Sequence, residues 1–209
     1  MSESRETIVL LHGFAASSLA LMLLRRRLAG RGFNAICWPY PSLRPSIRQH
    51  AQRLREYLGQ LGESGQRYHI VAHSMGSIVT RAALLDSLPS GLGRIVFLAP
   101  PNAGLPAARR APGIAKRFFA PLKELADTPT SFVNSLPQRM DVDVGIIAAR
   151  FDVLIPIINT HLPGERAHTT LNATHNSLLL TSGAASLIHR FLVQGDFAVS
   201  DAEATAVRL

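Results

Sequence analysis

Five consecutive residues, Ala72-His73-Ser74-Met75-Gly76, carry the strongest chemical signal in this chain. They separate an apolar run at 68–72, which predicts a strand, from a run at 75–88 that predicts a helix. Small residues two positions before and after a serine let strand and helix cross closely, so the hydroxyl stands exposed at a helix N-terminus. Backbone N–H groups and the helix dipole favour developing negative charge there. Ser74 is therefore a candidate nucleophile for acyl chemistry.

A serine nucleophile needs a general base, and reactive groups of a doubly wound sheet collect at the carboxyl ends of its strands. His175 fits this rule, because it lies in the loop between an expected strand at 167–171 and the last helix. His161 and His168 stay open as weaker candidates, since the element ends around them are not defined by the sequence. The remaining histidines are expected elsewhere: His69 at a strand start, His50 and His189 within helices, His73 inside the five-residue turn, and His12 in the loop after the first strand.

The imidazole needs an acid that fixes its tautomer and stabilises the imidazolium. Asp152 follows the expected strand 144–149 and so lies at the same sheet edge as His175. Asp127, in a proline-rich stretch, is the second choice. The chain order Ser74, Asp152, His175 is the order expected when the serine sits on a strand-to-helix elbow.

The oxyanion of an acyl intermediate needs two donors. The first expected donor is the backbone N–H of Met75, directly after the nucleophile. The second is the backbone N–H of Phe14, in the loop after the first strand, where Gly13 allows a close turn. His12 is expected to brace this loop without transferring protons.

The elements that must position these residues alternate along the chain, which predicts an α/β fold: a single doubly wound domain with a mostly parallel sheet flanked by helices. Strands are expected at 7–11, 34–38, 68–72, 94–98, 144–149 and 167–171, and helices at 17–29, 45–61, 75–88 and 177–193.

The chain of 209 residues suits one domain, expected at 1–195 with a C-terminal tail at 196–209. Residues 101–137 are expected to form a cap or lid-like insertion, and the stretch from Pro100 to Pro137 holds seven of the 13 prolines together with a basic cluster. Four apolar side chains of the insertion are expected on one helical face: Ile114, Phe118, Leu122 and Leu125. This face predicts either a lid that opens at a lipid interface or an ordinary cap helix, and both alternatives imply an apolar acyl pocket.

Composition narrows the function classes. The net charge of +8 would favour binding to nucleic acid, to anionic lipid or to acidic substrates, or would serve solubility alone. No nucleic-acid-binding motif accompanies this charge. The single cysteine excludes an intramolecular disulfide, and no metal-ligand spacing or cofactor fingerprint is evident. The apolar runs are too short for a signal peptide or a membrane span, so a cytoplasmic protein is expected.

The pattern Leu10-Leu11-His12-Gly13-Phe14, followed by the elbow at 72–76, Asp152 and His175, resembles the α/β-hydrolase superfamily. The Ala-His-Ser-Met-Gly elbow and the small size resemble compact bacterial lipases and esterases, over roughly residues 7–193. Ala72 stands where glycine is commoner. The first strand already carries the His-Gly loop, so the resemblance implies a minimal fold of six strands, without the two leading antiparallel strands of larger members.

The resemblance implies a serine hydrolase of the carboxylesterase or lipase class that cleaves esters of apolar acyl groups through an acyl-enzyme on Ser74. A thioesterase or acyltransferase with the same three residues stays open, and so does a non-catalytic binding module on this scaffold. The expected partner is a small acyl ester, and no nucleic-acid partner is expected. Weak association with an anionic membrane or lipid surface stays open. No cofactor and no metal are expected, and the sequence does not indicate an oligomeric state.

Overall fold

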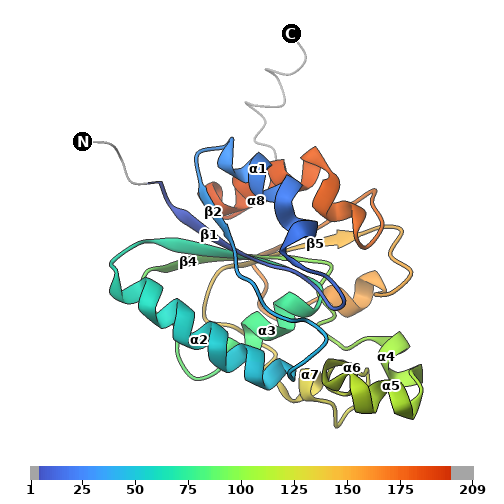
Figure 1. Cartoon of the computed structure of the whole chain (residues 1–209). Coiled ribbons are helices and arrows are strands. Elements are labelled where there is room, and N and C mark those ends of the chain that lie inside the picture. The colour runs from blue at the N-terminus through green and yellow to red at the C-terminus, as the bar shows by residue number, and fades with distance from the viewer. Residues whose placement is uncertain (1–4, 199–209) are drawn as a thin grey trace.

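A six-stranded parallel sheet forms the centre of the computed structural model, which describes residues 5–198 (Figure 1). The strands lie in the order β2-β1-β3-β4-β5-β6, with every neighbouring pair parallel. Their bounds are Thr7–Leu11 (β1), Asn34–Cys37 (β2), Tyr68–His73 (β3), Leu92–Leu98 (β4), Val144–Ala149 (β5) and Ala167–Leu171 (β6). The predicted α/β class and the six-stranded parallel core are confirmed.

Helices cover both faces of this sheet, which explains why β1, β3 and β5 are buried along their whole length (Figure 1). The 3-10 turn η1 (Ser18–Leu21), α1 (Met22–Ala29) and α8 (Ser182–Gln194) pack against the face that bears Ile8 and Leu10. The opposite face, with Val9 and Leu11, is covered by α2 (Ile47–Glu63) and α3 (Met75–Ala83). Successive residues of β1 thus enter two separate cores.

Helix α2 shows why one run of sequence becomes a helix. Its residues Ile47, Leu54 and Leu58 are fully buried on one face. Ser46 and Gln49 form a reciprocal capping box at its start. The helix therefore begins at Ile47, one residue after its cap, and not at the predicted Pro45.

Helix α3 is shorter than its predicted run of 75–88, because it ends at Ala83. The guanidinium of Arg55 donates to the carbonyl oxygens of Ala82 and Ala83, at 3.3 and 3.0 Å, and so satisfies acceptors that a longer helix would use. Pro89 also disfavours helical geometry in the residue before it. The chain leaves the helix here and turns toward β4.

The insertion at 101–137 folds into four short helices at the lower right of Figure 1, α4 (Pro106–Arg110), α5 (Gly113–Phe118), α6 (Ala120–Glu124) and α7 (Phe132–Ser135). The predicted single apolar face is wrong. The backbone leaves the helix at Phe119, and Pro121 then occupies the first turn of α6. Ile114 and Phe118 are consequently exposed, by 69% and 50%, whereas Leu125 is buried.

Both ends of the described chain lie at the sheet edge where the strands begin. Glu6 Oε2 is 2.9 Å from Nε2 of His69, at the start of β3. At the other end, Arg166 donates from Nε to the carbonyl oxygen of Gly195 at 2.8 Å, and Phe197 packs on Phe191 with ring centroids 5.0 Å apart. The expected tail therefore begins with ordered contacts, and its residues 199–209 lie outside the described residues.

Among residues 5–198, no helix has the length and apolar character needed to cross a membrane.

Candidate active site

Ser74 occupies a strained turn between β3 and α3. Its backbone angles, φ 52° and ψ −123°, fall where residues with a Cβ are rarely found. Gly76 permits the turn, because a Cβ at this position would come within 2.7 Å of the carbonyl oxygen of His12. The arrangement is that of a nucleophile elbow, which raises the serine above the carboxyl end of the sheet at the start of a helix.

His175 and Asp152 meet at the same sheet edge. Nδ1 of His175 lies 2.7 Å from Oδ2 of Asp152. The other carboxylate oxygen accepts the backbone N–H groups of Leu154 and Ile155, at 2.9 and 3.0 Å. Only 10% of the His175 side chain and 2% of the Asp152 side chain are exposed. The carboxylate is therefore fixed on both oxygens, and it holds the imidazole ring in one orientation.

Hydrogen bonding decides the charge of Asp152. Burial alone would raise the pKa of this carboxyl, but the hydrogen bond from His175 and the N–H groups of Ile155 and Leu154 outweigh burial and lower the pKa below its ordinary value. The ionised carboxylate accepts a hydrogen bond from the N–H group at Nδ1 of His175, and the proton stays on the imidazole. The lone pair is then on Nε2, the atom with which a histidine takes a proton from serine.

The loop after β1 lies directly against Ser74. A Cβ on Gly13 would come within 3.0 Å of Cβ of Ser74 and 3.2 Å of Nδ1 of His73. The His12 ring stacks on Tyr40 with centroids 4.3 Å apart, as expected for a bracing residue. This position supports the backbone N–H groups of Phe14 and Met75 as oxyanion donors, and their role stays a prediction.

Substitution of Gly13 by alanine is expected to lower kcat for ester hydrolysis by roughly a hundredfold, the cost of losing one oxyanion donor. The added methyl meets Ser74 and His73 at the distances given above, so the loop that presents the Phe14 N–H must shift. Steady-state kinetics on a p-nitrophenyl ester measure the loss, and thermal unfolding serves as the control for folding. An unchanged kcat would contradict the assignment of this loop.

His73 has a contact that the sequence did not reveal. Its Nε2 donates to the backbone carbonyl oxygen of His175 at 3.0 Å, and the two rings lie 4.7 Å apart. Burial, followed by the nearby charge of His175, lowers the pKa of His73 to about 3. A neutral His73 thus holds in place the loop that carries His175. The contact joins residues 102 positions apart, so no local pattern signals it.

Acid is expected to destabilise the folded protein partly through His73. The unfolded histidine binds a proton below about pH 6.5, whereas the folded one binds it only near its lowered pKa. Between these values the unfolded state holds one more proton, so the free energy of unfolding decreases as pH falls, by up to about 1.4 kcal/mol per pH unit. Urea unfolding of the wild type and His73→Phe between about pH 7 and about pH 5 measures this. The variant should show the shallower slope, and equal slopes would contradict the prediction.

The alternative candidates have other partners. His161 and His168 stack on each other with ring centroids 3.9 Å apart. Asp127, the second choice of acid, forms an ion pair with Arg109 of the cap at 3.3 Å. These contacts leave Asp152 as the acid that pairs with His175.

A cavity of about 790 Å³ opens beside the elbow. Its wall comes from the loops after β1, β2 and β6, together with His73, and the wall residues are Phe14, Ala15, Ala16, Ser17, Ala20, Pro41, Ser42, Leu43, Asn176, Leu179 and Leu180. Most of these side chains are apolar. A mainly apolar cavity therefore lies beside the elbow, but its described wall includes neither Ser74 nor any of residues 101–137, and its role as the acyl pocket stays a prediction.

Three solved structures share this fold. The propeptide form of Bacillus licheniformis lipase BlEst2 aligns with a TM-score of 0.75 and 16% identity, over 90% of this chain and 51% of that one. Legionella pneumophila phospholipase PlaB in complex with thio-NAD aligns with a TM-score of 0.72 and 14% identity, over 90% and 58%. Aspergillus fumigatus lipase B aligns with a TM-score of 0.78 and 15% identity, over 97% and 57%. The chain spans little more than half the length of each, and at these identities the likeness shows the fold alone.

No curated protein matches the chain significantly. The model of the alpha/beta hydrolase family matches residues 8–203, a range that includes Ser74, Asp152 and His175. The parallel sheet and its strand order agree with this match. The chain belongs to the alpha/beta hydrolase family.

Proposed function

We propose that this hydrolase cleaves carboxylic esters of apolar acyl groups through an acyl-enzyme on Ser74. The observation that carries the proposal is the strained Ser74 at the same sheet edge as the hydrogen-bonded pair of His175 and Asp152. A strained backbone persists only where the surrounding structure enforces it, and such strain collects at functional sites. The three side-chain types together match the requirements of nucleophilic acyl transfer.

The proposed reaction has two halves. His175 takes the proton of Ser74 as Oγ attacks the ester carbonyl, and the backbone N–H groups of Phe14 and Met75 stabilise the oxyanion. The protonated His175 then gives its proton to the leaving alcohol, which departs and leaves the acyl group on Ser74. In the second half, His175 takes a proton from water, which attacks the acyl-enzyme, and then returns this proton to Oγ of Ser74 as the acid leaves.

The preference for apolar acyl groups is supported by the cavity beside the elbow, whose wall is mainly apolar. The related folds described above belong to proteins named as lipases and a phospholipase. Weak association with an anionic lipid surface stays a prediction. Ile114 and Phe118 are exposed on α5, which also carries Lys116 and Arg117.

Release of free acid from matched p-nitrophenyl esters and acyl-thioesters tests the substrate class. A higher kcat/KM for the esters with water as acceptor is the expected result. Higher activity on thioesters would favour a thioesterase, and formation of a new ester with an added alcohol, without release of free acid, would favour an acyltransferase. A wild-type protein that neither releases acid nor reacts with a fluorophosphonate would be a binding module, and the proposal would be wrong.

A further inference from the structure

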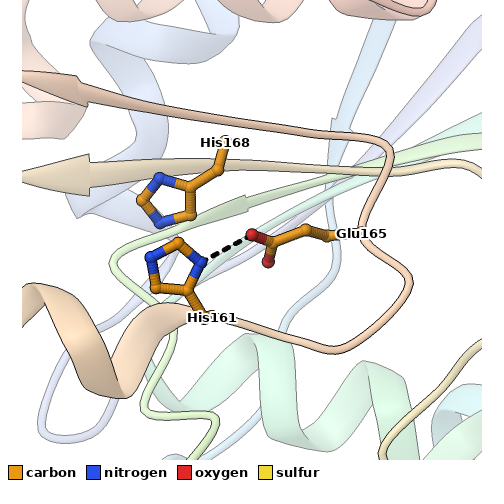
Figure 2. Close-up of side chains that lie close together, drawn as sticks. All are labelled: His161, Glu165 and His168. Atoms are coloured by element: carbon orange, nitrogen blue, oxygen red, sulfur yellow. Dashed lines mark hydrogen bonds and ion pairs between the residues drawn. The ribbon is translucent and has the colours of Figure 1, made fainter.

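Three side chains of types that can ligate a metal converge beside the edge strand β6 (Figure 2). They are His161, Glu165 and His168, and one donor atom from each lies within 4.8 Å of the other two. Nδ1 of His161 is 2.7 Å from Oε1 of Glu165, and Figure 2 shows both imidazole rings on the same side of the loop as the carboxylate. The spacing His-x3-Glu-x2-His crosses from a loop into a strand, so it matches no helical pattern of ligands.

The residues around the three side chains hold them in place. Oε2 of Glu165 accepts the backbone N–H of Leu162 at 2.7 Å, which orients the carboxylate. Oγ1 of Thr160 lies 2.8 Å from Nε2 of His168. Thr160 is buried, and its own carbonyl oxygen accepts from Asn102 of the neighbouring segment at 2.7 Å. Such outer contacts orient the ligands in protein metal sites.

The donor set selects the kind of metal. Two imidazoles and one carboxylate suit Zn²⁺, which binds nitrogen and oxygen donors at roughly 2.0–2.2 Å, whereas Ca²⁺ and Mg²⁺ prefer oxygen donors alone. Tetrahedral bonds of this length place the ligand atoms roughly 3.4 Å apart. The present spread of up to 4.8 Å, with the two rings stacked 3.9 Å apart, thus requires a rotation of one ring together with a contraction, because the lone pair of each ring nitrogen lies in the plane of its ring. His161 can make this movement, since 46% of its side chain is exposed, and this exposure also gives the ion a path from solvent.

We propose that His161, Glu165 and His168 bind one Zn²⁺ ion, with water in the fourth position, and that the ion fastens the segment between β5 and β6. This segment runs from Arg150 to Arg166 and contains only the 3-10 turn η2 (Ile157–Thr160) as regular structure. It also contains Asp152 near its start, so the ion would stabilise, from the far end, the segment whose N–H groups hold that carboxylate. The site is separate from the proposed acyl chemistry, because none of its three ligands contacts Ser74 or His175 in any described interaction.

Calorimetric titration of tag-free protein with ZnCl₂ tests the site, with thermal unfolding measured in parallel. We expect one Zn²⁺ per chain and a rise in melting temperature of roughly 5–10 °C at a free Zn²⁺ concentration of about one hundred times Kd. His168→Ala and Glu165→Gln should lose both effects. His175→Ala should keep both, because His175 pairs with Asp152 and with no residue of the cluster in any described ion pair.

A matched control is His189→Ala, which removes a histidine that lies on α8 against Phe33, outside the cluster. It should bind Zn²⁺ as the wild type does. Co²⁺ added in place of Zn²⁺ should give the visible absorption of a four-coordinate ion in the wild type and not in His168→Ala. The proposal is overturned if the wild type binds no Zn²⁺, or if His161→Ala and His168→Ala bind Zn²⁺ as tightly as the wild type does. In the latter case His161 and Glu165 form only a surface ion pair.

Discussion

Replacement of Ser74 by alanine is expected to lower kcat for ester hydrolysis by roughly a million-fold, the loss found when the nucleophile of such a triad is removed. The substitution deletes only Oγ and leaves the pair of His175 and Asp152 intact. The remaining acceleration would come from the oxyanion donors and from substrate binding. Steady-state release of p-nitrophenol measures the loss, and covalent labelling with a fluorophosphonate should disappear with it.

Ser17→Ala is the matched control, because Ser17 is an exposed serine in the wall of the cavity beside the elbow. It should retain both turnover and labelling. Equal labelling of Ser74→Ala and the wild type would show that another residue is the nucleophile. Since alanine keeps the strained backbone at this position, the two proteins should unfold at similar temperatures, so a loss of activity cannot be attributed to a loss of fold.

Asp152→Asn is expected to lower kcat by about 10⁴-fold while the fold persists. The amide oxygen can still accept the N–H groups of Leu154 and Ile155, so the loop keeps its shape. The amide nitrogen then faces Nδ1 of His175 and donates to it. This moves the imidazole proton to Nε2, and the base can no longer accept the proton of Ser74. Steady-state kinetics measure the loss, and circular dichroism checks the fold.

Asp127→Asn is the control for the acid. Asp127 forms its ion pair with Arg109 inside the cap, so its neutral variant should keep near-normal turnover. A near-normal rate for Asp152→Asn, with a large loss for Asp127→Asn, would reverse the two assignments.

Local sequence patterns were sufficient to predict the sheet. The apolar run at 144–149 gave the bounds of β5 as the structure has them, because a fully buried parallel strand has little polar content. The bounds expected at 167–171 also match β6, although this edge strand contains His168 and two threonines and is only half-buried. Once these strands were located, the rule that reactive groups lie at strand ends led to Asp152 and His175. Their hydrogen bond was thus predictable as a consequence of topology.

Contacts between distant segments were not predictable in this way. The cap was expected to present one helical face, but Pro121 divides it, and the cavity wall comes from loops elsewhere in the chain. The contact between His73 and His175, and the convergence of His161 with His168, depend on how loops pack across the sheet edge. Hydrophobic periodicity carries no information about such packing.

Both ends of the described part of the chain, near residues 5 and 198, lie at the edge where the strands begin, and this has a practical consequence. An attachment through the described residues near position 5 or position 198 would be anchored on the side of the sheet opposite Ser74, since Glu6 contacts the start of β3 and Gly195 contacts Arg166, just before β6. Immobilisation on a solid support through either end should therefore leave the nucleophile facing the surrounding solution. Such a protein would keep access even to substrates that are themselves presented on vesicles or droplets.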